Sequence, residues 1–183
     1  MPEIELHTMK TGSANNKKWH VIYTRSRAEK KVAADLTRQN IDYFLPLQKK
    51  LRQWKDRKKW VETPLISGYC FVCITRREYD KVLQADNVVC YITFEGKAAI
   101  IPHDQIDVLK QMTQQSDFEV SVSKANFEPG QKVEIIAGPM MGIRGELVKF
   151  QKKEKFVLRI EQINTVFSVE VPAEIITALP KDS

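Results

Sequence analysis

Two cysteines in a Cys-x-x-Cys arrangement are the residues whose spacing most suggests metal or redox chemistry. Cys70 and Cys73 lie in the apolar run SGYCFVCI, and the third cysteine of the chain is Cys90. The run has the composition of a buried strand, on which positions three apart point to opposite faces. No second Cys or His pair stands at ligand spacing. We therefore predict small buried thiols, with no metal and no other cofactor.

Other patterns that carry chemistry are also missing from the sequence. It contains no phosphate-binding loop, no nucleophile elbow and no His/Asp/Glu cluster at metal-ligand spacing. We expect a binding protein rather than an enzyme.

The densest charge lies in residues 49–60, KKLRQWKDRKKW, which hold seven Lys or Arg residues and one acid, Asp56. A turn at Asp56 predicts a long hairpin that projects from a sheet, with its tip near Lys55–Lys58. Lys and Arg bind phosphates in a salt-dependent way. Trp54 and Trp60 either stack on a base or staple the hairpin across its strands, and we favour the staple.

Charge divides the chain into two unequal parts. Residues 1–115 hold 20 Lys or Arg and 13 Asp or Glu, a net charge of +7, whereas residues 116–183 hold 9 and 10, a net charge of −1. This asymmetry indicates two domains with different partners. A basic domain meets nucleic acid or an acidic protein surface, although a lysine-rich solvated surface gives the same numbers.

The elements that position these residues follow from periodicity. Residues 1–17 are polar and predict a flexible tail, and residues 18–115 read β-α-β-β-α-β-α. Capping-box patterns at 26–29 and 75–78 predict helix starts, with helices over 27–40 and after 75. Tyr79, Val82 and Leu83 should face inward from the second helix, and Ile106, Leu109 and Met112 from the third.

The C-terminal part has a different sequence pattern, in which turns separate short predicted strands. Residues 116–127 lack periodicity and predict a linker, in which Phe118, Val120 and Phe127 are the side chains able to pack. Short strands over 132–137, 145–150, 155–160 and 165–171 follow, separated by turns at 129–130, 138–142, 152–154 and 162–164. This spacing predicts a small SH3-like barrel over 128–180. The fold class is thus α+β, an antiparallel sheet with helices followed by an all-β barrel.

These segments resemble known families. Residues 128–148, EPGQKVEIIAGPMMGIRGELV, look like a KOW motif, with glycines at 130, 138, 142 and 145. Residues 18–115 resemble the N-terminal (NGN) domain of NusG, through Trp19, Tyr23, Glu29, Val32 and the segment PLISGYCFV at 64–72. The order of the two domains makes the chain similar to NusG-type transcription elongation factors. The hairpin sequence followed by PLISGY looks most like the specialised UpxY-type paralogues, antiterminators of capsular and other surface-polysaccharide operons.

The resemblance implies a function. The NGN domain would bind the clamp helices of RNA polymerase, suppressing pausing and termination, and would touch non-template DNA or the upstream duplex. The KOW domain would recruit a second partner, which in this family is ribosomal protein S10 or Rho. A ribosome-associated or translation KOW protein is the alternative, and it explains the barrel but not the first domain.

The resemblance also implies site residues. The polymerase-binding positions are Tyr23, Ile66, Tyr69 and Tyr91. The nucleic-acid-binding positions are Arg25, Arg27, Lys55, Arg57, Lys58 and Lys59, with the two arginines expected near the hairpin. The KOW partner loop holds Met140, Met141 and Ile143.

The sequence also predicts where the protein is located and whether it forms oligomers. The N-terminus has no apolar h-region, and no stretch is long and apolar enough for a membrane helix. The odd cysteine count fits a reducing compartment. We expect a cytoplasmic monomer without a membrane partner.

Overall fold

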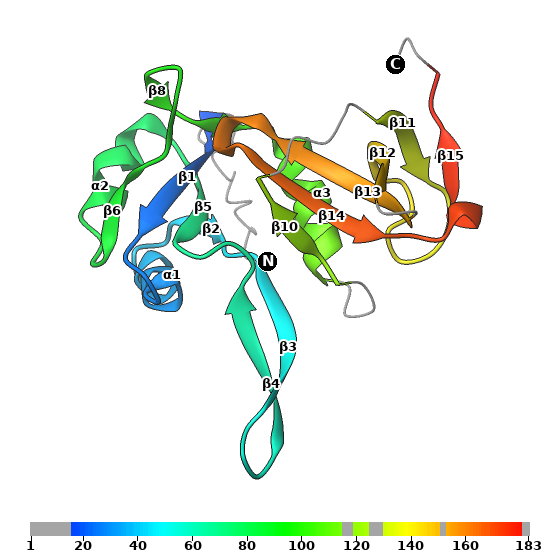
Figure 1. The fold of residues 1–183 in the computed structure, drawn as a ribbon. Helices are drawn as coiled ribbons and strands as arrows, with labels where there is room; N and C mark the ends of the chain where they lie inside the picture. Colours follow the sequence, from blue (N-terminus) through cyan, green and yellow to red (C-terminus); the bar gives the residue numbers. More distant parts are fainter. Residues whose placement is uncertain (1–15, 115–118, 125–129, 151–152, 181–183) are drawn as a thin grey trace, which may run out of the picture.

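The structure, a computed structural model, describes residues 16–114, 119–124, 130–150 and 153–180 (Figure 1). Most of the expected tail, together with Phe118, Phe127, Pro129 and Lys152, lies outside the described residues. Within them, no helix has the length and apolar character needed to cross a membrane.

The first sheet is antiparallel and contains five strands in the order β2-β5-β1-β6, with β9 also paired to β1. Its members are β1 (Lys18–Thr24), β2 (Asp42–Phe44), β5 (Tyr69–Ile74), β6 (Val88–Tyr91) and β9 (Ile100–Ile101). The central strands are rich in β-branched and aromatic residues, which suit a sheet buried on both sides. The predicted mixture of antiparallel strands and helices is confirmed for this part of the chain.

Helices cover both faces of this sheet. One face carries Ile22, Cys70 and Val72 and packs against α1 (Glu29–Arg38) and α2 (Tyr79–Leu83). The other face carries Trp19, Val21, Phe71 and Cys73 and shares a core with α3 (His103–Gln114), through Ile106, Leu109 and Met112. Figure 1 shows α3 on the side of the sheet away from α1 and α2. The predictions of opposite faces for the two cysteines and of a buried α3 stripe are confirmed.

The first helix does not begin with a capping box, so that prediction is wrong. Its N-cap is Ala28, and no side chain caps it. Arg27 has a left-handed backbone conformation with φ of 61°, so the α-helix cannot extend back through Arg27 to Ser26. The helix is therefore shorter than the predicted 27–40, and Glu29 is buried and bonded elsewhere.

The second capping box is confirmed. Glu78 accepts hydrogen bonds from the Thr75 N–H at 2.8 Å and from Thr75 Oγ1 at 2.9 Å. The capped turn is a 3-10 helix, η2 (Arg76–Glu78), that leads directly into α2. Val82 is fully buried, but Leu83 is 41% exposed, so the prediction that Leu83 faces inward is wrong. Adjacent positions of a helix point about 100° apart, so the face that buries Val82 turns Leu83 toward solvent.

A two-stranded ribbon made of β3 (Leu47–Gln53) and β4 (Lys58–Pro64) projects from the body, as predicted for the basic run (Figure 1). Its turn is closed by a hydrogen bond from the Trp54 N–H to the Arg57 carbonyl oxygen at 2.8 Å. A second, smaller hairpin joins β7 (Thr93–Phe94) to β8 (Lys97–Ala98). Both of its turn residues, Glu95 and Gly96, have positive φ, as tight hairpin turns require.

The second sheet is antiparallel and has six strands in the order β10-β14-β13-β12-β11-β15. Its members are β10 (Ser121–Ser123), β11 (Gln131–Ile135), β12 (Arg144–Phe150), β13 (Lys153–Ile160), β14 (Thr165–Glu170) and β15 (Ile176–Ala178). Short 3-10 turns, η3 (Glu161–Ile163) and η4 (Ala173–Ile175), join the last strands. The described pairings leave β10 and β15 at opposite ends of this path, so they do not by themselves close a barrel.

The two sheets share a core through α3. The Gln105 amide of α3 donates to the Arg159 carbonyl oxygen of β13 at 3.5 Å. Buried Val120, Phe156 and Leu158 belong to the same apolar cluster as Met112. Residues 121–123, expected to be part of a linker, form the edge strand β10 against β14. The sequence predicts no strand there because three residues are too few for a periodic signal.

Candidate functional site

Tyr23 and Tyr69 form a cross-strand aromatic pair at the end of the β1–β5 ladder. Their ring centroids are 6.0 Å apart in an edge-to-face arrangement. Tyr23 is 42% exposed, whereas Tyr69 is half-buried and packs against the apolar core. The pair therefore presents one exposed and one supported ring, a combination suited to a protein interface.

The loop before Tyr69 is held by a buried acid. Glu29, 3% exposed, accepts a hydrogen bond from the Gly68 N–H at 2.8 Å and one from Ser67 Oγ at 3.4 Å. The Gly68 carbonyl oxygen accepts from the Thr24 N–H at 2.7 Å. Gly68 has φ of +80°, and a Cβ atom there would lie 2.7 Å from Cε2 of Tyr23. Glycine is thus required both for the backbone conformation and for the close approach of the Tyr23 ring.

The other two residues expected to bind polymerase, Ile66 and Tyr91, are less exposed than Tyr23. Ile66 is half-buried on the same core as Tyr69. Tyr91 is 6% exposed, lies opposite Ile22 on the face covered by α1 and α2, and stacks on Tyr79 with centroids 4.0 Å apart. Its hydroxyl donates to the Tyr79 carbonyl oxygen at 2.9 Å, and burial raises its pKa. Tyr91 is packed in the core, because its strand neighbour Cys90 is the residue opposite Tyr23 and neighbouring strand positions face opposite ways. Its role in polymerase binding stays a prediction.

The expected nucleic-acid-binding residues fall into two groups. Arg25 and Arg27 are exposed in the connection between β1 and α1. Lys55, Arg57, Lys58 and Lys59 are exposed at or beside the ribbon turn. Figure 1 shows the ribbon tip well away from the β1–α1 connection, so the structure does not bring the two groups together.

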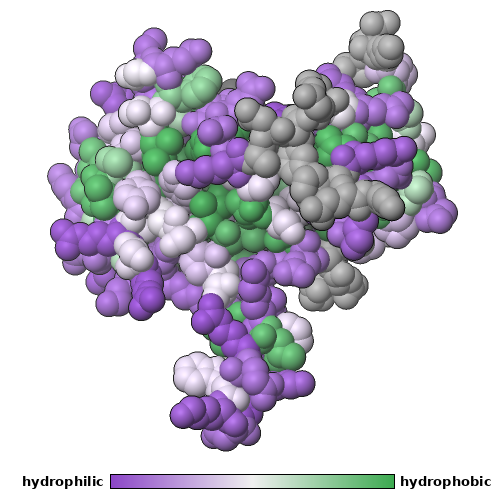
Figure 2. All heavy atoms as spheres, in the orientation of Figure 1, coloured by the Kyte–Doolittle hydropathy of each residue, from purple (hydrophilic) through white to green (hydrophobic). Residues whose placement is uncertain are grey.

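The ribbon has two different faces. The register places Trp60 opposite Leu51, and Arg52 opposite Lys59 on the other face. Trp54 lies in the turn and not across from Trp60, and the two indoles are 58% and 65% exposed. Trp60 therefore holds the cross-strand position that the expected staple requires, opposite Leu51, whereas Trp54 does not. Figure 2 shows the ribbon as largely hydrophilic, interrupted by an apolar patch.

The expected partner loop of the second sheet is only partly exposed. Met140 and Ile143 are 1% and 4% exposed and belong to the core. They are buried because the loop folds back onto β11, where the Gly142 N–H donates to the Ile135 carbonyl oxygen at 2.7 Å. Their role in partner binding stays a prediction. Met141 is 66% exposed, and Ile136, which no sequence motif marks as a contact residue, is 48% exposed.

The described part of the site presents side chains able to bind a partner. Among the described residues, no group of three or more His, Cys, Asp or Glu side chains is placed to hold a metal ion. Burial raises the pKa of the Cys70 thiol to about 12, which keeps it protonated and unreactive. The arrangement of exposed aromatic and basic side chains on a ribbon and a strand edge is one for recognition.

Comparison with protein families identifies the first part of the chain. The model of the NusG family, described as transcription termination factor nusG, matches residues 17–110, just over half of the sequence. The chain belongs to the NusG family. NusG-family proteins are non-enzymatic transcription factors, which confirms the expectation of a protein that is not an enzyme. A comparison with curated proteins finds no match.

Solved structures resemble the chain at low identity. NusG of Thermotoga maritima, from a study of its domain interaction, is 18% identical with a TM-score of 0.47, and the match covers 90% of this chain and 98% of that one. The MjSpt4:Spt5 complex matches in conformation A with 18% identity and a TM-score of 0.30, covering 89% and 99% of the two chains. Conformation B matches with 20% identity and a TM-score of 0.31, covering 90% and 99%.

Proposed function

We propose that this NusG-family chain is a transcription elongation and antitermination factor that binds the clamp helices of RNA polymerase. Residues 18–115 would act as the polymerase-binding NGN unit and residues 128–180 as a KOW unit. The bound factor would hold the clamp closed, shorten pauses and reduce termination. The hairpin sequence favours a specialised UpxY-type member serving surface-polysaccharide operons.

The observation that carries the proposal is the Tyr23–Tyr69 pair within the segment matched by the family model. The Tyr23 ring stays 42% exposed, so part of its apolar surface remains in contact with water, which is unfavourable unless a partner covers it. The β1–β5 ladder and the Glu29–Gly68 bond fix its position before any partner arrives. Preorganised aromatic anchors of this kind dominate the affinity of protein interfaces.

A pull-down of core RNA polymerase by full-length tagged variants tests this assignment. The Tyr23→Ala/Tyr69→Ala variant should retain at least tenfold less polymerase than the wild type, since each lost anchor costs about 1–2 kcal/mol. Phe94→Ala is the matched control, because Phe94 is 40% exposed on the separate β7–β8 hairpin. Undiminished retention by a folded double variant would remove this surface from the polymerase contact.

We further propose that the ribbon tip contacts non-template DNA or the upstream duplex. Lys55 and Arg57 make no ion pair with any described acid, so their charge is free to meet phosphates. Reversing both to Glu should weaken mobility shifts on a transcription bubble and flatten the salt dependence. Reversing exposed Arg77 and Lys97 makes the same change of net charge away from the ribbon. Equal losses of DNA affinity in the two double variants would mean that overall charge, and not the ribbon tip, determines binding.

The KOW unit would recruit a second partner, ribosomal protein S10 or Rho. Met141 and Ile136 are the exposed apolar side chains near the 138–142 turn, and Met adapts readily to a partner surface. Titration of the labelled chain with S10, followed by NMR, should shift signals around Met141. The same titration with Rho distinguishes the two partners, and silence in both titrations would remove this surface from partner binding.

A further inference from the structure

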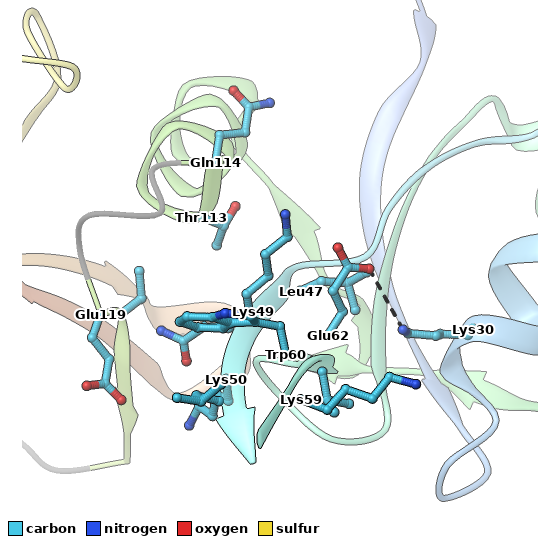
Figure 3. Close-up of a pocket in the computed structure, with 14 residues that line it drawn as sticks. Lys30, Leu47, Lys49, Lys50, Lys59, Trp60, Glu62, Thr113, Gln114 and Glu119 are labelled. Carbon is cyan, nitrogen blue, oxygen red and sulfur yellow. Dashed lines mark ion pairs between the residues drawn. The ribbon is translucent and has the colours of Figure 1, made fainter. Parts of the chain in front are cut away.

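The β3–β4 ribbon has an open edge along β3. Among the described residues each strand of the ribbon pairs only with the other, so β3 presents a row of backbone N–H and C=O groups that no further strand meets. An open cleft of about 1300 Å³ lies beside the ribbon and is lined by five successive β3 residues, Leu47–Leu51 (Figure 3). The ion pair drawn there joins Lys30 to Glu62 of β4 at 3.9 Å. A two-stranded ribbon is only marginally stable by itself, and a third strand would stabilise it.

The two faces of the ribbon differ in chemistry at the middle of β3. Lys50 and Arg52 point to one face, together with Lys59, the cross-strand partner of Arg52. All three are exposed, and none makes an ion pair with a described acid. Leu51 points to the other face beside its partner Trp60, and these two side chains are 48% and 65% exposed. A strand that complements this edge therefore carries acidic side chains on one face and apolar side chains on the other.

The chain itself contains a segment with this alternation. Residues 3–6, which lie outside the described residues, have the sequence EIEL, in which acidic residues alternate with apolar ones. Side chains two positions apart on a strand share a face, so residues 3–5 match residues 50–52 position by position, acid to cation and isoleucine to leucine. A slip of one residue would move both acids to the apolar face, so the pattern specifies the register.

The connection is long enough for this contact. Residue 6 and Asn16, the first described residue, are ten positions apart, and the chain between them can span up to about 33–36 Å. Lys17 is held beside β2 by its ion pair of 2.6 Å with Asp42. The first residue of β3, Leu47, follows five positions after Asp42, a distance of at most about 18 Å along the chain. The described chain thus starts close to the base of the ribbon, where tethering gives a segment an effective concentration of about millimolar.

We propose that residues 3–6 of this chain bind the open edge of β3 as a third strand of the ribbon. The two glutamates of the segment lie against Lys50 and Arg52, and its apolar residues share the face of Leu51. The main-chain groups of the edge supply hydrogen bonds, and the alternating side chains select the segment. This contact requires neither polymerase nor nucleic acid, so it goes beyond the proposed function. It also shields two cations of the ribbon from other anions.

Amide hydrogen exchange of the isotope-labelled full-length chain, followed by NMR, tests the proposal. The amides of Leu47–Gln53 that point away from β4 should be protected in the wild type. Glu3→Lys/Glu5→Lys places like charges across the edge and should accelerate their exchange about fivefold or more. Adding Lys50→Glu/Arg52→Glu restores opposite charges and should restore the protection.

Glu95→Lys/Glu174→Lys is the matched control for net charge. It reverses two exposed acids, one in the β7–β8 turn and one in η4, both away from the ribbon (Figure 1). Exchange at the β3 edge should stay as in the wild type, because neither acid lies near the segment or the ribbon. Acceleration equal to that of Glu3→Lys/Glu5→Lys would make overall charge the cause and would overturn the proposal.

The remaining outcomes separate the possible occupants of the edge. Exchange that Glu3→Lys/Glu5→Lys leaves unchanged, or that the added Lys50→Glu/Arg52→Glu pair does not restore, would exclude residues 3–6 as the occupant. Protection that falls when the chain is diluted about tenfold would make a second copy the occupant and would likewise overturn the proposal. Polymerase and nucleic acid are absent from the measurement, so its failure would leave the proposed function standing. Failure of polymerase retention would, in turn, leave a protected edge standing.

Discussion

Glu29 and Gly68, 39 positions apart in the sequence, are joined by a hydrogen bond of 2.8 Å from the Gly68 N–H to Oε1 of the buried Glu29 side chain. The bond fastens the start of α1 to the loop that leads into β5. Because Gly68 also approaches the Tyr23 ring, one short loop sets both members of the Tyr23–Tyr69 pair. The geometry of the exposed aromatic surface therefore depends on a residue that does not belong to it.

Glu29→Ala should lower the free energy of unfolding by about 1–3 kcal/mol, because the buried Gly68 N–H loses its acceptor. Urea denaturation of the full-length chain measures the change. Glu62→Ala is the control, since Glu62 is exposed and its one ion pair among the described residues is with Lys30 at 3.9 Å, and its expected effect is below about 1 kcal/mol. Equal effects of the two substitutions would contradict the structural role assigned to Glu29.

Gly68→Ala should both destabilise the chain and displace the Tyr23 ring. The positive φ alone costs about 1–2 kcal/mol for a residue with a side chain, and the new Cβ would clash with the ring at 2.7 Å. Gly96 has φ of +77°, and no described atom lies within 4 Å of the place a Cβ would take, so Gly96→Ala carries the backbone cost without the clash. Polymerase retention should fall for Gly68→Ala and not for Gly96→Ala. Identical retention would mean that the position of Tyr23 does not matter.

Tyr91 should behave as a core residue. Tyr91→Ala removes a ring stacked on Tyr79 and should cost about 3–5 kcal/mol of unfolding free energy. Tyr91→Phe loses only the hydroxyl bond to the Tyr79 carbonyl oxygen and should cost about 0.5–1.5 kcal/mol, with normal polymerase retention. Loss of polymerase by a stable Tyr91→Phe variant would instead make the hydroxyl a contact group.

Glu78 should make the stability of the chain depend on acid pH. Hydrogen bonds from Thr75, first from its backbone N–H, hold the pKa of the Glu78 carboxyl below its usual value. A folded pKa below the unfolded one gives stability that is present above about pH 4.3 and is lost as the pH falls through the folded value. The advantage of the wild type over Glu78→Gln in urea denaturation should therefore shrink between neutral pH and about pH 3. An advantage that stays constant over this range would contradict the linkage.

The two capping-box patterns show how far sequence reasoning reaches. Ser26 to Glu29 and Thr75 to Glu78 have the same spacing, yet only the second forms the box. Glu78 finds its partner three residues away, so local sequence suffices. Glu29 bonds instead to Gly68, whose position is fixed only when β5 pairs with β1. Local patterns predicted most of the strands, the ribbon and the α3 stripe, but not the short strands β10 and β15 or the partner that Glu29 finds in the folded chain.

In the candidate site, too, the sequence predicts local structure but not which side chains the tertiary fold buries. Strand periodicity predicts that Tyr69 and Tyr91 are sheet residues, but the face covered by α1 and α2 is decided by packing, which buries Tyr91 and leaves Tyr23 open. Likewise, Met140 and Met141 are adjacent and chemically identical, and only the fold of their turn buries one and exposes the other. The ribbon lysines were visible as a basic run, whereas their meeting with the end of α3 depends on contacts distant in sequence.

The most direct test of the account is whether the full-length tagged chain co-purifies with core RNA polymerase from a lysate at low and at moderate salt. Retention at both concentrations is the predicted result, because a contact anchored by Tyr23 and Tyr69 is apolar and only weakly screened by salt. Absence of polymerase at both concentrations, with ribosomes or DNA recovered in its place, would contradict the claim that this NusG-family chain acts on the elongating polymerase.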